Sequence, residues 1–357
     1  MRIVYVIGTR PNFVKTAPVI AALRRRLPDA RHAIVHTGQH YDRTMSEIFF
    51  EELGVPAPDH MLDVGSGSHA VQTARTMERL EPVLEGEKPD LVMVPGDVNS
   101  TLAAVLTAVK MQIPVAHIES GLRSFDRTMP EEINRIVADE FSEYLFLHSE
   151  EATENLRAEG IGEERMHFVG NTMIDTLVAL EDRFRAAESA AKLGVEPGRY
   201  ALVTLHRPAL VDGELLAETV RRLAELAVEM PVVFPVHPRT RKRMEAVSAE
   251  HPGLLLSEPL GYVDFLSLLA DAGAVLTDSG GIQEETTYLG VPCFTLRDNT
   301  ERPVTIRAGT NTLLGLDPAA IAGIPAALAE RPTGRPEPPP LWDGHAAERI
   351  AEAIAPA

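Results

Sequence analysis

Charged side chains able to act on a substrate gather between His117 and Glu140. The stretch follows an apolar run typical of a buried strand, turns at Gly121 and enters a helix near Pro130, a residue well tolerated at the first helical position. Its acids and bases are Glu119, Arg123, Asp126, Arg127, Glu131, Glu132 and Arg135. An open α/β sheet binds its ligand just past strand ends, although a surface loop rich in ion pairs would have the same composition.

Asp97 follows a second strand-like run, Leu91–Pro95, and a carboxylate at that position could reach into a crevice. Asp97, Asn99 and Ser100 could also cap the helix that the pattern predicts over 102–111. We assign the capping role to Asn99 and Ser100, and a functional role to Asp97.

Asp97, Glu119 and Glu131 thus form a set of three carboxylates that we expect on loops at one edge of a sheet. Carboxyl groups gathered in one crevice raise one another's pKa, and a carboxyl with a raised pKa can act as a general acid near neutral pH. Arg123 and Arg135 belong to the same stretch, and we expect them to hold the remaining acids ionised.

Basic residues follow the first strand-like run, Ile3–Ile7. The turn Gly8-Thr9-Arg10-Pro11-Asn12 leads into a helix that carries Lys15, and it matches neither the dinucleotide fingerprint nor the P-loop. A helix N-terminus with Arg10 and Lys15 beside it could bind a phosphate or a carboxylate. Arg10 could equally cap the helix or pair with a surface acid.

Two histidines follow strand-like runs of the second half, in His206-Arg207-Pro208 and His237-Pro238-Arg239. A single histidine is more often structural than catalytic. Because two histidines follow equivalent strands of one domain, we weight a functional role and a structural role equally for each.

The segment Thr277–Glu285 is the most informative of the second half. A strand runs into Ser279-Gly280-Gly281 and then a helix, so exposed backbone N–H groups and the helix dipole favour a diphosphate. Glu285, farther along that helix, could accept hydrogen bonds from a ribose diol or could be an exposed helix acid. Arg302 lies in a polar loop downstream and could reach a phosphate.

The elements that must position these residues alternate between short β-branched runs and helical patterns, which predicts βαβ units and parallel sheets. The expected strands are Ile3–Ile7, Ala33–Thr37, Leu91–Pro95, Val115–Ile118, Tyr144–Leu147, His167–Val169, Ala201–Leu205, Val232–Val236, Leu254–Ser257, Ala274–Thr277 and Pro292–Leu296. The expected organisation is an N-terminal domain over 1–170, a helical linker over 171–198, a second domain over 199–340 and a C-terminal helical segment over 341–357 that packs back on the first domain.

The composition excludes several classes of protein. A chain of 357 residues with 45% hydrophobic and 24% charged residues fits two globular domains. A net charge of -18 without a basic stretch argues against nucleic-acid binding. The lone Cys293 excludes an intramolecular disulfide, no apolar run suggests a membrane span, and we expect a cytoplasmic protein. No Cys/His cluster with metal-ligand spacing occurs, so we expect neither a metal nor another cofactor.

The order of the motifs resembles the non-hydrolysing UDP-N-acetylglucosamine 2-epimerases over nearly the whole chain. The matching segments are GTRPNFVK, TGQH, GDVNSTLA, HIESGLRSFDRTMPEEINR, TLHRP, PVHPRT, DSGGIQEE and LRDNTERP. The resemblance implies an α/β fold with two Rossmann-like domains facing across a cleft, of the glycosyltransferase-B type, and a homodimer. It also implies the interconversion of UDP-GlcNAc and UDP-ManNAc, which supplies ManNAc units for surface polysaccharides.

The reaction implied by the resemblance moves no hydride, which agrees with the missing dinucleotide motif. UDP leaves by anti elimination to give 2-acetamidoglucal, and syn re-addition after protonation at C2 gives the inverted sugar. The resemblance assigns the acid–base work to Asp97, Glu119 and Glu131, with His206 as a further catalytic contact. It implies that Arg135 orients the acids.

The resemblance also assigns residues to binding. The positions matching the family's UDP-binding and sugar-binding residues are Arg10, Lys15, Arg135, His237, Ser279, Gly280, Gly281, Glu285 and Arg302. Gln39, His40 and Arg207 match the region where bacterial members bind a second, activating UDP-GlcNAc. Many members carry H-R-x-E-N there, whereas this chain has Ala209 and Leu210 at the two polar positions, which argues against such activation.

Three other functions are compatible with parts of the pattern. A hydrolysing epimerase would release ManNAc and UDP from the same residues. A glycosyltransferase of the same architecture would need an acceptor groove and would not need three carboxylates in its first domain. A regulator that binds a nucleotide sugar without catalysis is disfavoured by the complete set of acids.

Overall fold

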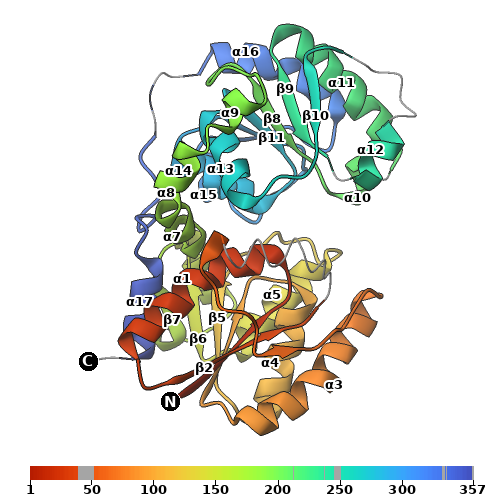
Figure 1. Ribbon diagram of the computed structural model, residues 1–357. Helices are drawn as coiled ribbons and strands as arrows, with labels where there is room; N and C mark the ends of the chain where they lie inside the picture. Colours follow the sequence, from red (N-terminus) through yellow and green to blue (C-terminus); the bar gives the residue numbers. More distant parts are fainter. Residues whose placement is uncertain are drawn as a thin grey trace. The chain divides into compact units, whose positions relative to one another are not determined.

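The computed structural model describes residues 1–38, 52–211, 213–236, 238–244, 251–331, 334 and 336–355 (Figure 1). The chain forms two compact units. Unit 1 comprises Met1–Ala179 together with Pro340–Ala357, and unit 2 comprises Leu180–Pro339. The expected linker over 171–198 is therefore divided between the units, because 171–179 belongs to unit 1 and 180–198 belongs to unit 2.

Unit 1 contains a parallel sheet with the strand order β3-β2-β1-β4-β5-β6-β7. Its strands are β1 Arg2–Ile7, β2 Arg31–His36, β3 His60–Met61, β4 Leu91–Pro95, β5 Val115–Ser120, β6 Tyr144–Leu147 and β7 Met166–Phe168. The apolar runs β1 and β4 are buried along almost their entire length, as in parallel sheets with both faces covered.

Helices cover both faces of this sheet. They are α1 Arg10–Arg26, α3 His69–Glu87, α4 Asn99–Lys110, α5 Pro130–Phe141, α6 Glu150–Ala158, α7 Thr172–Ala179 and α17 Ala346–Ile354, with the 3-10 turn η1 Glu163–Arg165. Apolar side chains of α3, α4 and α5 share one core cluster with alternate residues of β1, β2 and β4. Helix α1 packs instead against α7 and α17, so the unit has three layers (Figure 1).

The C-terminal segment is built into unit 1 by polar contacts as well as by burial. The indole of Trp342 is buried and donates a 2.8 Å hydrogen bond to the carbonyl of His148. Asp175 of α7 accepts hydrogen bonds from the backbone N–H groups of Ala346 and Ala347, at 3.1 and 2.6 Å, and thereby satisfies the start of α17. Helix α17 lies within the C-terminal helical segment expected over 341–357.

Unit 2 contains a second parallel sheet, with the order β10-β9-β8-β11-β12-β13. Its strands are β8 Ala201–Thr204, β9 Val232–Pro235, β10 Leu254–Ser257, β11 Ala274–Thr277, β12 Cys293–Thr295 and β13 Asn311–Leu313. Its helices are α8 Glu181–Ala186, α9 Ser189–Lys192, α10 Pro208–Val211, α11 Leu215–Glu229, α12 Pro238–Met244, α13 Tyr262–Asp271, α14 Gly280–Leu289, α15 Val304–Arg307 and α16 Ile324–Ala329, with the 3-10 turn η2 Pro318–Gly323. The predicted α/β class and its two parallel sheets are confirmed.

Each sheet has one point where the strand order reverses, and these points determine where ligands can bind. In unit 1 the reversal lies between β1 and β4, and in unit 2 it lies between β8 and β11. Open parallel sheets bind ligands outside the carboxyl ends of the strands at such a point. The residues following β1, β4, β8 and β11 are the ones that the sequence marked for chemistry.

Gly170 tests the docking of the C-terminal segment on unit 1. It has a φ of +91°, and a Cβ there would lie 2.0 Å from the carbonyl oxygen of Leu341. We expect Gly170→Ala to lower the free energy of unfolding by about 1–2 kcal/mol through left-handed strain and by about 1–3 kcal/mol more through the clash. Trp342 is the only tryptophan, so its fluorescence emission should move to longer wavelength.

The matched control is Gly160→Ala, because Gly160 has a φ of +84° and a Cβ added there would meet no other residue within 4 Å. This variant should lose only the strain contribution and keep the emission of Trp342. Equal urea midpoints and equal emission spectra for the two variants would contradict the docking of Leu341 against Gly170.

Candidate active site

Lys15 and Asp97 come from the two sides of the reversal point in unit 1. Lys15 lies on α1, which begins after β1, and it is directed to this edge of the sheet because a capping box formed by Thr9 and Asn12 starts the helix immediately after the strand. Asp97 follows β4, and its carboxylate remains 25% exposed. An acid at that position can therefore still meet a substrate.

Glu119 is placed by an irregularity in β5. Its φ is +67°, which is unusual for a residue other than glycine, and the pairing of β5 with β6 shifts between Ile118 and Ser120. A bulge of this kind redirects a side chain and is common beside active sites. Backbone in this region costs roughly 1–3 kcal/mol and persists only where the surrounding structure enforces it.

The buried carboxylate of Glu119 forms an ion pair with the ammonium group of Lys15. Gly96 lies against this pair with a φ of +62°, and a Cβ there would lie 3.3 Å from Nζ of Lys15, so the ammonium group would have to shift by a few tenths of an ångström. Removing one member of a buried pair typically costs about 3–5 kcal/mol, since the other charge is left uncompensated. Each of Lys15 and Glu119 therefore needs the other as its partner in the buried site.

The guanidinium of Arg135 contacts two acids, Asp97 and Glu132. Its guanidinium contacts the carboxylate of Asp97 through Nη1, and it donates from Nε and Nη2 to Oε2 of Glu132 at 3.0 and 2.7 Å. Asn134 adds a 2.8 Å hydrogen bond to the carbonyl of Asp97. The basic residue expected to orient the acids thus contacts Asp97 directly.

Glu131 and Glu132 differ in surroundings although both lie in the first turn of α5. Glu132 is buried and accepts hydrogen bonds from the backbone of Ser124 and Phe125. Burial opposes its ionisation, but these hydrogen bonds and Arg135 prevail and lower the pKa of Glu132. Glu131 is partly exposed and makes no ion pair with another described residue, so its carboxylate is available to a ligand.

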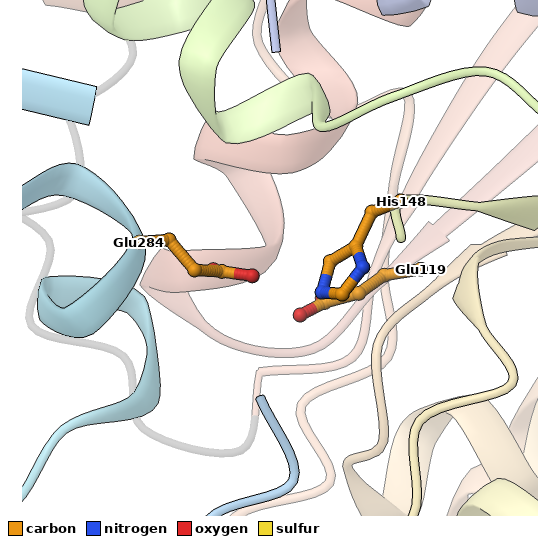
Figure 2. A group of neighbouring side chains, drawn as sticks. All are labelled: Glu119, His148 and Glu284. Carbon is orange, nitrogen blue, oxygen red and sulfur yellow. The ribbon is translucent and has the colours of Figure 1, made fainter. Parts of the chain in front are cut away.

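His148 is an additional histidine at this edge. It follows β6, and its ring lies beside Glu119, with a ring nitrogen within 4.8 Å of a carboxylate oxygen (Figure 2). A cavity of about 10 Å³ lies among Glu119, His148 and Asn171, and this is about the volume that one water molecule needs. The ring also packs edge-on against Trp342, which fixes its position.

In unit 2, the side chain of Arg302 packs against Gly280, the first residue of α14. A Cβ on Gly280 would lie 2.3 Å from Nη1 of Arg302, so only glycine allows this approach. The guanidinium also contacts Glu301, and its Nε lies 3.0 Å from Glu284. Ser279 is the N-cap residue of α14, whose first N–H groups and dipole favour an anion.

His206 is oriented by Asp278, which lies at the end of the neighbouring strand. Nδ1 of His206 is 2.6 Å from Oδ1 of Asp278, while the histidine side chain is 66% exposed. Oδ2 of Asp278 accepts the backbone N–H groups of His206 and Arg207 at 2.9 and 2.7 Å. Burial opposes the ionisation of Asp278, but His206 and these N–H groups prevail and lower its pKa. Nε2 of His206 is thereby presented outward.

Glu285 is buried and accepts a 2.7 Å hydrogen bond from the hydroxyl of Tyr262. Burial raises the pKa of Glu285 to about 7, with a further contribution from the neighbouring Glu284, although the hydrogen bond from Tyr262 acts in the opposite direction. The exposed helix acid considered as an alternative is therefore wrong. A carboxyl of this kind can accept or donate hydrogen bonds near neutral pH.

Some predicted residues lie outside the described part of the chain, namely Gln39, His40, His237 and the side chain of Arg10. Arg207 is described and donates from Nε to the carbonyl of Asp278 at 3.1 Å. Leu210, which replaces a polar residue of the family pattern, is fully buried in the core of unit 2.

Three residues of these two edges were missed in the sequence, namely His148, Asp278 and Glu284, and Glu132 was named in the charged stretch but given no role. His148 and Asp278 directly follow strands, so the rule that selected Asp97 could have selected them as well. Glu132 and Glu284 adjoin selected glutamates within helices, and only the orientation of each helix distinguishes the neighbours.

Comparisons with known proteins agree with this arrangement. A family model described as UDP-N-acetylglucosamine 2-epimerase matches residues 22–355. The UDP-N-acetylglucosamine 2-epimerase of Methanocaldococcus jannaschii is 44% identical, with 88% of each chain covered. The chain belongs to the UDP-N-acetylglucosamine 2-epimerase family. It is therefore an epimerase.

A solved structure and a second relative extend the comparison. A crystal structure of the Methanocaldococcus jannaschii UDP-GlcNAc 2-epimerase in complex with UDP-GlcNAc and UDP is 40% identical, covers 99% of each chain and has a TM-score of 0.89. A UDP-2,3-diacetamido-2,3-dideoxy-D-glucuronate 2-epimerase of Pseudomonas aeruginosa is 43% identical, with 88% of each chain covered. Among the described helices of this epimerase, none combines the length and apolarity needed to cross a membrane.

Glu285 gives unit 2 a pH-dependent stability. Its pKa of about 7 in the folded protein lies above the ordinary value of 4.5, so the folded state binds the proton more tightly than the unfolded state does. Its contribution is complete below pH 4.5 and is lost as the pH rises through 7. Relative to Glu285→Gln, the free energy of unfolding should fall by about 3 kcal/mol over this range.

Urea unfolding of the wild type and of Glu285→Gln at pH 5 and pH 8 measures this difference. Glu229→Gln, on the exposed side of α11, is the control and should follow the wild type at both pH values. Parallel pH dependence of the wild type and Glu285→Gln would contradict the raised pKa.

Proposed function

We propose that this epimerase interconverts UDP-N-acetylglucosamine and UDP-N-acetylmannosamine without net hydrolysis. The observation that carries the proposal is the pairing of two acids with two separate cations at one sheet edge, Glu119 with Lys15 and Asp97 with Arg135. Inversion at a carbon requires proton transfer on both of its faces, and two separately held carboxylates meet that requirement.

The first half of the proposed reaction is an elimination. The bond between C1 and the diphosphate oxygen breaks, and its electron pair leaves with UDP. A carboxylate of unit 1 then accepts the proton from C2, which gives 2-acetamidoglucal. Because this proton is barely acidic, cleavage at C1 leads, and positive charge develops on the ring beside the acids Asp97, Glu119 and Glu131.

The second half reverses these steps on the other face of C2. A carboxylic acid delivers a proton to C2 from the opposite side, and the diphosphate oxygen attacks C1 again. His206 is the further acid–base group in this proposal, because Asp278 holds its ring while leaving Nε2 outward. The proton balance closes, since one proton leaves C2 and one returns.

Unit 2 supplies the groups for the leaving diphosphate in this proposal. Ser279, Gly280 and Gly281 form the start of α14, where N–H groups and the helix dipole favour negative charge. Arg302 adds a fixed positive charge next to Gly280. Glu285 is assigned to the ribose hydroxyls because a buried carboxyl can fix them by hydrogen bonds, as it fixes Tyr262. Arg10 and His237 are assigned to UDP by their motifs alone.

A second UDP sugar is a candidate substrate of the same site. The Pseudomonas aeruginosa relative is named for a UDP sugar that carries a second acetamido group at C3 and a carboxylate at C6, and its identity of 43% is close to the 44% of the Methanocaldococcus jannaschii relative. Both substrates present the same 2-acetamido group and diphosphate. Assaying both sugars in parallel therefore determines which substituents at C3 and C6 the enzyme accepts. The proposed mechanism is the same for both sugars.

The proposal includes an assembly and a setting. We infer a homodimer in the cytoplasm that supplies ManNAc units for surface polysaccharides, with no membrane or nucleic-acid partner. Activation by a second UDP-GlcNAc is not part of the proposal, because Ala209 and Leu210 replace two polar residues and Leu210 belongs to a hydrophobic core.

Incubation with UDP-GlcNAc in D2O tests substrate, reaction and mechanism together. We expect UDP-ManNAc carrying deuterium at C2, because the proton lost in elimination is replaced from solvent-exchanged acids. Mass spectrometry and proton NMR of the recovered sugars measure the label. UDP-ManNAc without deuterium after prolonged incubation would contradict the elimination mechanism, and accumulation of free ManNAc with UDP would instead indicate a hydrolysing epimerase.

Asp97→Asn tests the role of the acid after β4. The amide cannot exchange a proton with C2, so kcat should fall at least about 100-fold, the lower range of a general acid–base contribution. Calorimetric UDP binding should persist, because Asp97 is not among the residues proposed to bind the diphosphate.

The matched control is Asp90→Asn, since Asp90 precedes the same strand and its carboxylate accepts a 2.7 Å hydrogen bond from the backbone of Arg2. It should retain the wild-type rate. Full activity of Asp97→Asn would remove Asp97 from the catalytic set.

A further inference from the structure

His117 is fully buried in β5, and its ring is held between two hydrogen-bond acceptors. Nδ1 lies 2.7 Å from a carboxylate oxygen of Asp139, on α5, and Nε2 lies 2.7 Å from the carbonyl oxygen of Gly96. A neutral imidazole carries one N–H and could donate to only one of these groups. Only the doubly protonated ring donates to both.

The charges around His117 favour this cationic form. Asp139 also receives a 2.7 Å hydrogen bond from Arg123, and Arg123 in turn forms a two-pronged contact with Glu159 at 2.7 and 2.6 Å. Burial opposes the ionisation of Asp139, but His117 and Arg123 prevail and lower its pKa. With His117 protonated, the cluster contains two cations and two anions and is electrically balanced.

The two acceptors of His117 are connected to two of the acids of the proposed reaction, Asp97 and Glu119. Gly96 immediately precedes Asp97, and its backbone is fixed twice to β5, by its N–H to the carbonyl of Ile118 at 2.9 Å and by its carbonyl to His117. The other oxygen of Asp139 accepts the N–H of Gly121 at 3.0 Å. Glu119 lies between His117 and Gly121, in the bulge.

We propose that His117 is a positioning residue that donates from both ring nitrogens and, with Asp139, fixes the distance between Asp97 and Glu119. One hydrogen bond of the imidazolium holds the turn that carries Asp97. The other passes through Asp139 to the far side of the bulge, where it holds the left-handed backbone of Glu119 in place. The inference deepens the proposed function and rests on it for its kinetic consequence, but the protonation of His117 does not depend on any activity.

A single rigid link between two acids has a recognisable kinetic effect. The two carboxylates must act on one carbon, and a misplacement of about 1 Å can cost about 100-fold in rate even when binding is intact. Losing the link should therefore lower kcat while leaving KM and UDP affinity near their wild-type values, since groups that act only in the transition state affect kcat. His117 contacts neither acid, so this effect would arise through backbone position.

The first experiment is nitrogen NMR of the wild-type protein labelled with 15N-histidine, recorded between pH 6 and pH 9. The signal of His117 is assigned by its loss in His117→Gln. We expect both ring nitrogens to carry a proton throughout, because Asp139 and Gly96 both require a donor. A ring that changes to one proton within this range, or that has one proton throughout, would overturn the proposal whether or not the enzyme is an epimerase.

The second experiment is the kinetics of His117→Gln and Asp139→Asn in the full chain. Glutamine can donate toward only one of the two acceptors, and asparagine keeps an acceptor for His117 but removes the negative charge that sustains its second proton. Both variants should lower kcat about 10- to 100-fold with KM changed less than about threefold, and Asp139→Asn should also convert His117 to a neutral ring.

The control is His60→Gln, which removes another histidine–carboxylate contact of unit 1, the 2.8 Å pair of His60 and Glu87. It should leave kcat unchanged. If His117→Gln and Asp139→Asn are both folded, as judged by circular dichroism, and both keep the wild-type kcat, the positioning role is overturned. If the wild type itself lacks 2-epimerase activity, the proposed function fails while the NMR result still decides the protonation of His117.

Discussion

In the described part of the chain, both sheets consist of parallel strands whose faces are covered by the apolar sides of helices. This constraint determines where polar groups can lie. A polar group cannot be presented from a face that is buried, so chemistry is confined to strand ends and to the turns that follow them. In unit 1 the turns after β4 and β6 supply Asp97 and His148, the helix that begins after β1 supplies Lys15, and the end of β5 supplies Glu119. In unit 2 the turns after β8 and β11 supply His206 and the start of α14.

The same confinement forces charges into partly or fully buried positions, where each needs a partner. Desolvation of an isolated ion is costly, so the acids of these edges are held by basic residues: Glu119 by Lys15, Asp97 by Arg135, and Glu284 and Glu301 by Arg302. These contacts do not add much stability, because burial cancels most of the Coulomb attraction. Their effect is geometric, since each fixes a carboxylate or guanidinium of the candidate site relative to backbone of the same unit.

Much of this arrangement could be predicted from the sequence, because apolar runs and strand ends are local patterns. Nearly every strand was located, and α17 lies within the helical segment expected over 341–357. Strands β3 and β13 were missed because neither His60-Met61 nor Asn311-Thr312-Leu313 is an apolar run. The distinction between Glu131 and Glu132 depends on which side of α5 faces the preceding loop. Asp139 lies inside a helix, and its partners His117, Gly121 and Arg123 lie 16 to 22 residues away in the chain. No local pattern of the sequence contains this relation.

The order in which the ribosome makes the chain adds a consequence to the docking of the C-terminal segment. Asp175 caps α17 through Ala346, 171 residues later, and the indole of Trp342 reaches His148 across 194 residues. All of unit 2 is synthesised in between. At translation rates of about 5–20 residues per second, unit 1 must wait on the order of ten seconds or more for its last helix after the rest of it has emerged. During that interval α1 and α7 expose the apolar surface that α17 later covers, so a nascent chain stalled within unit 2 would be a natural client for chaperones.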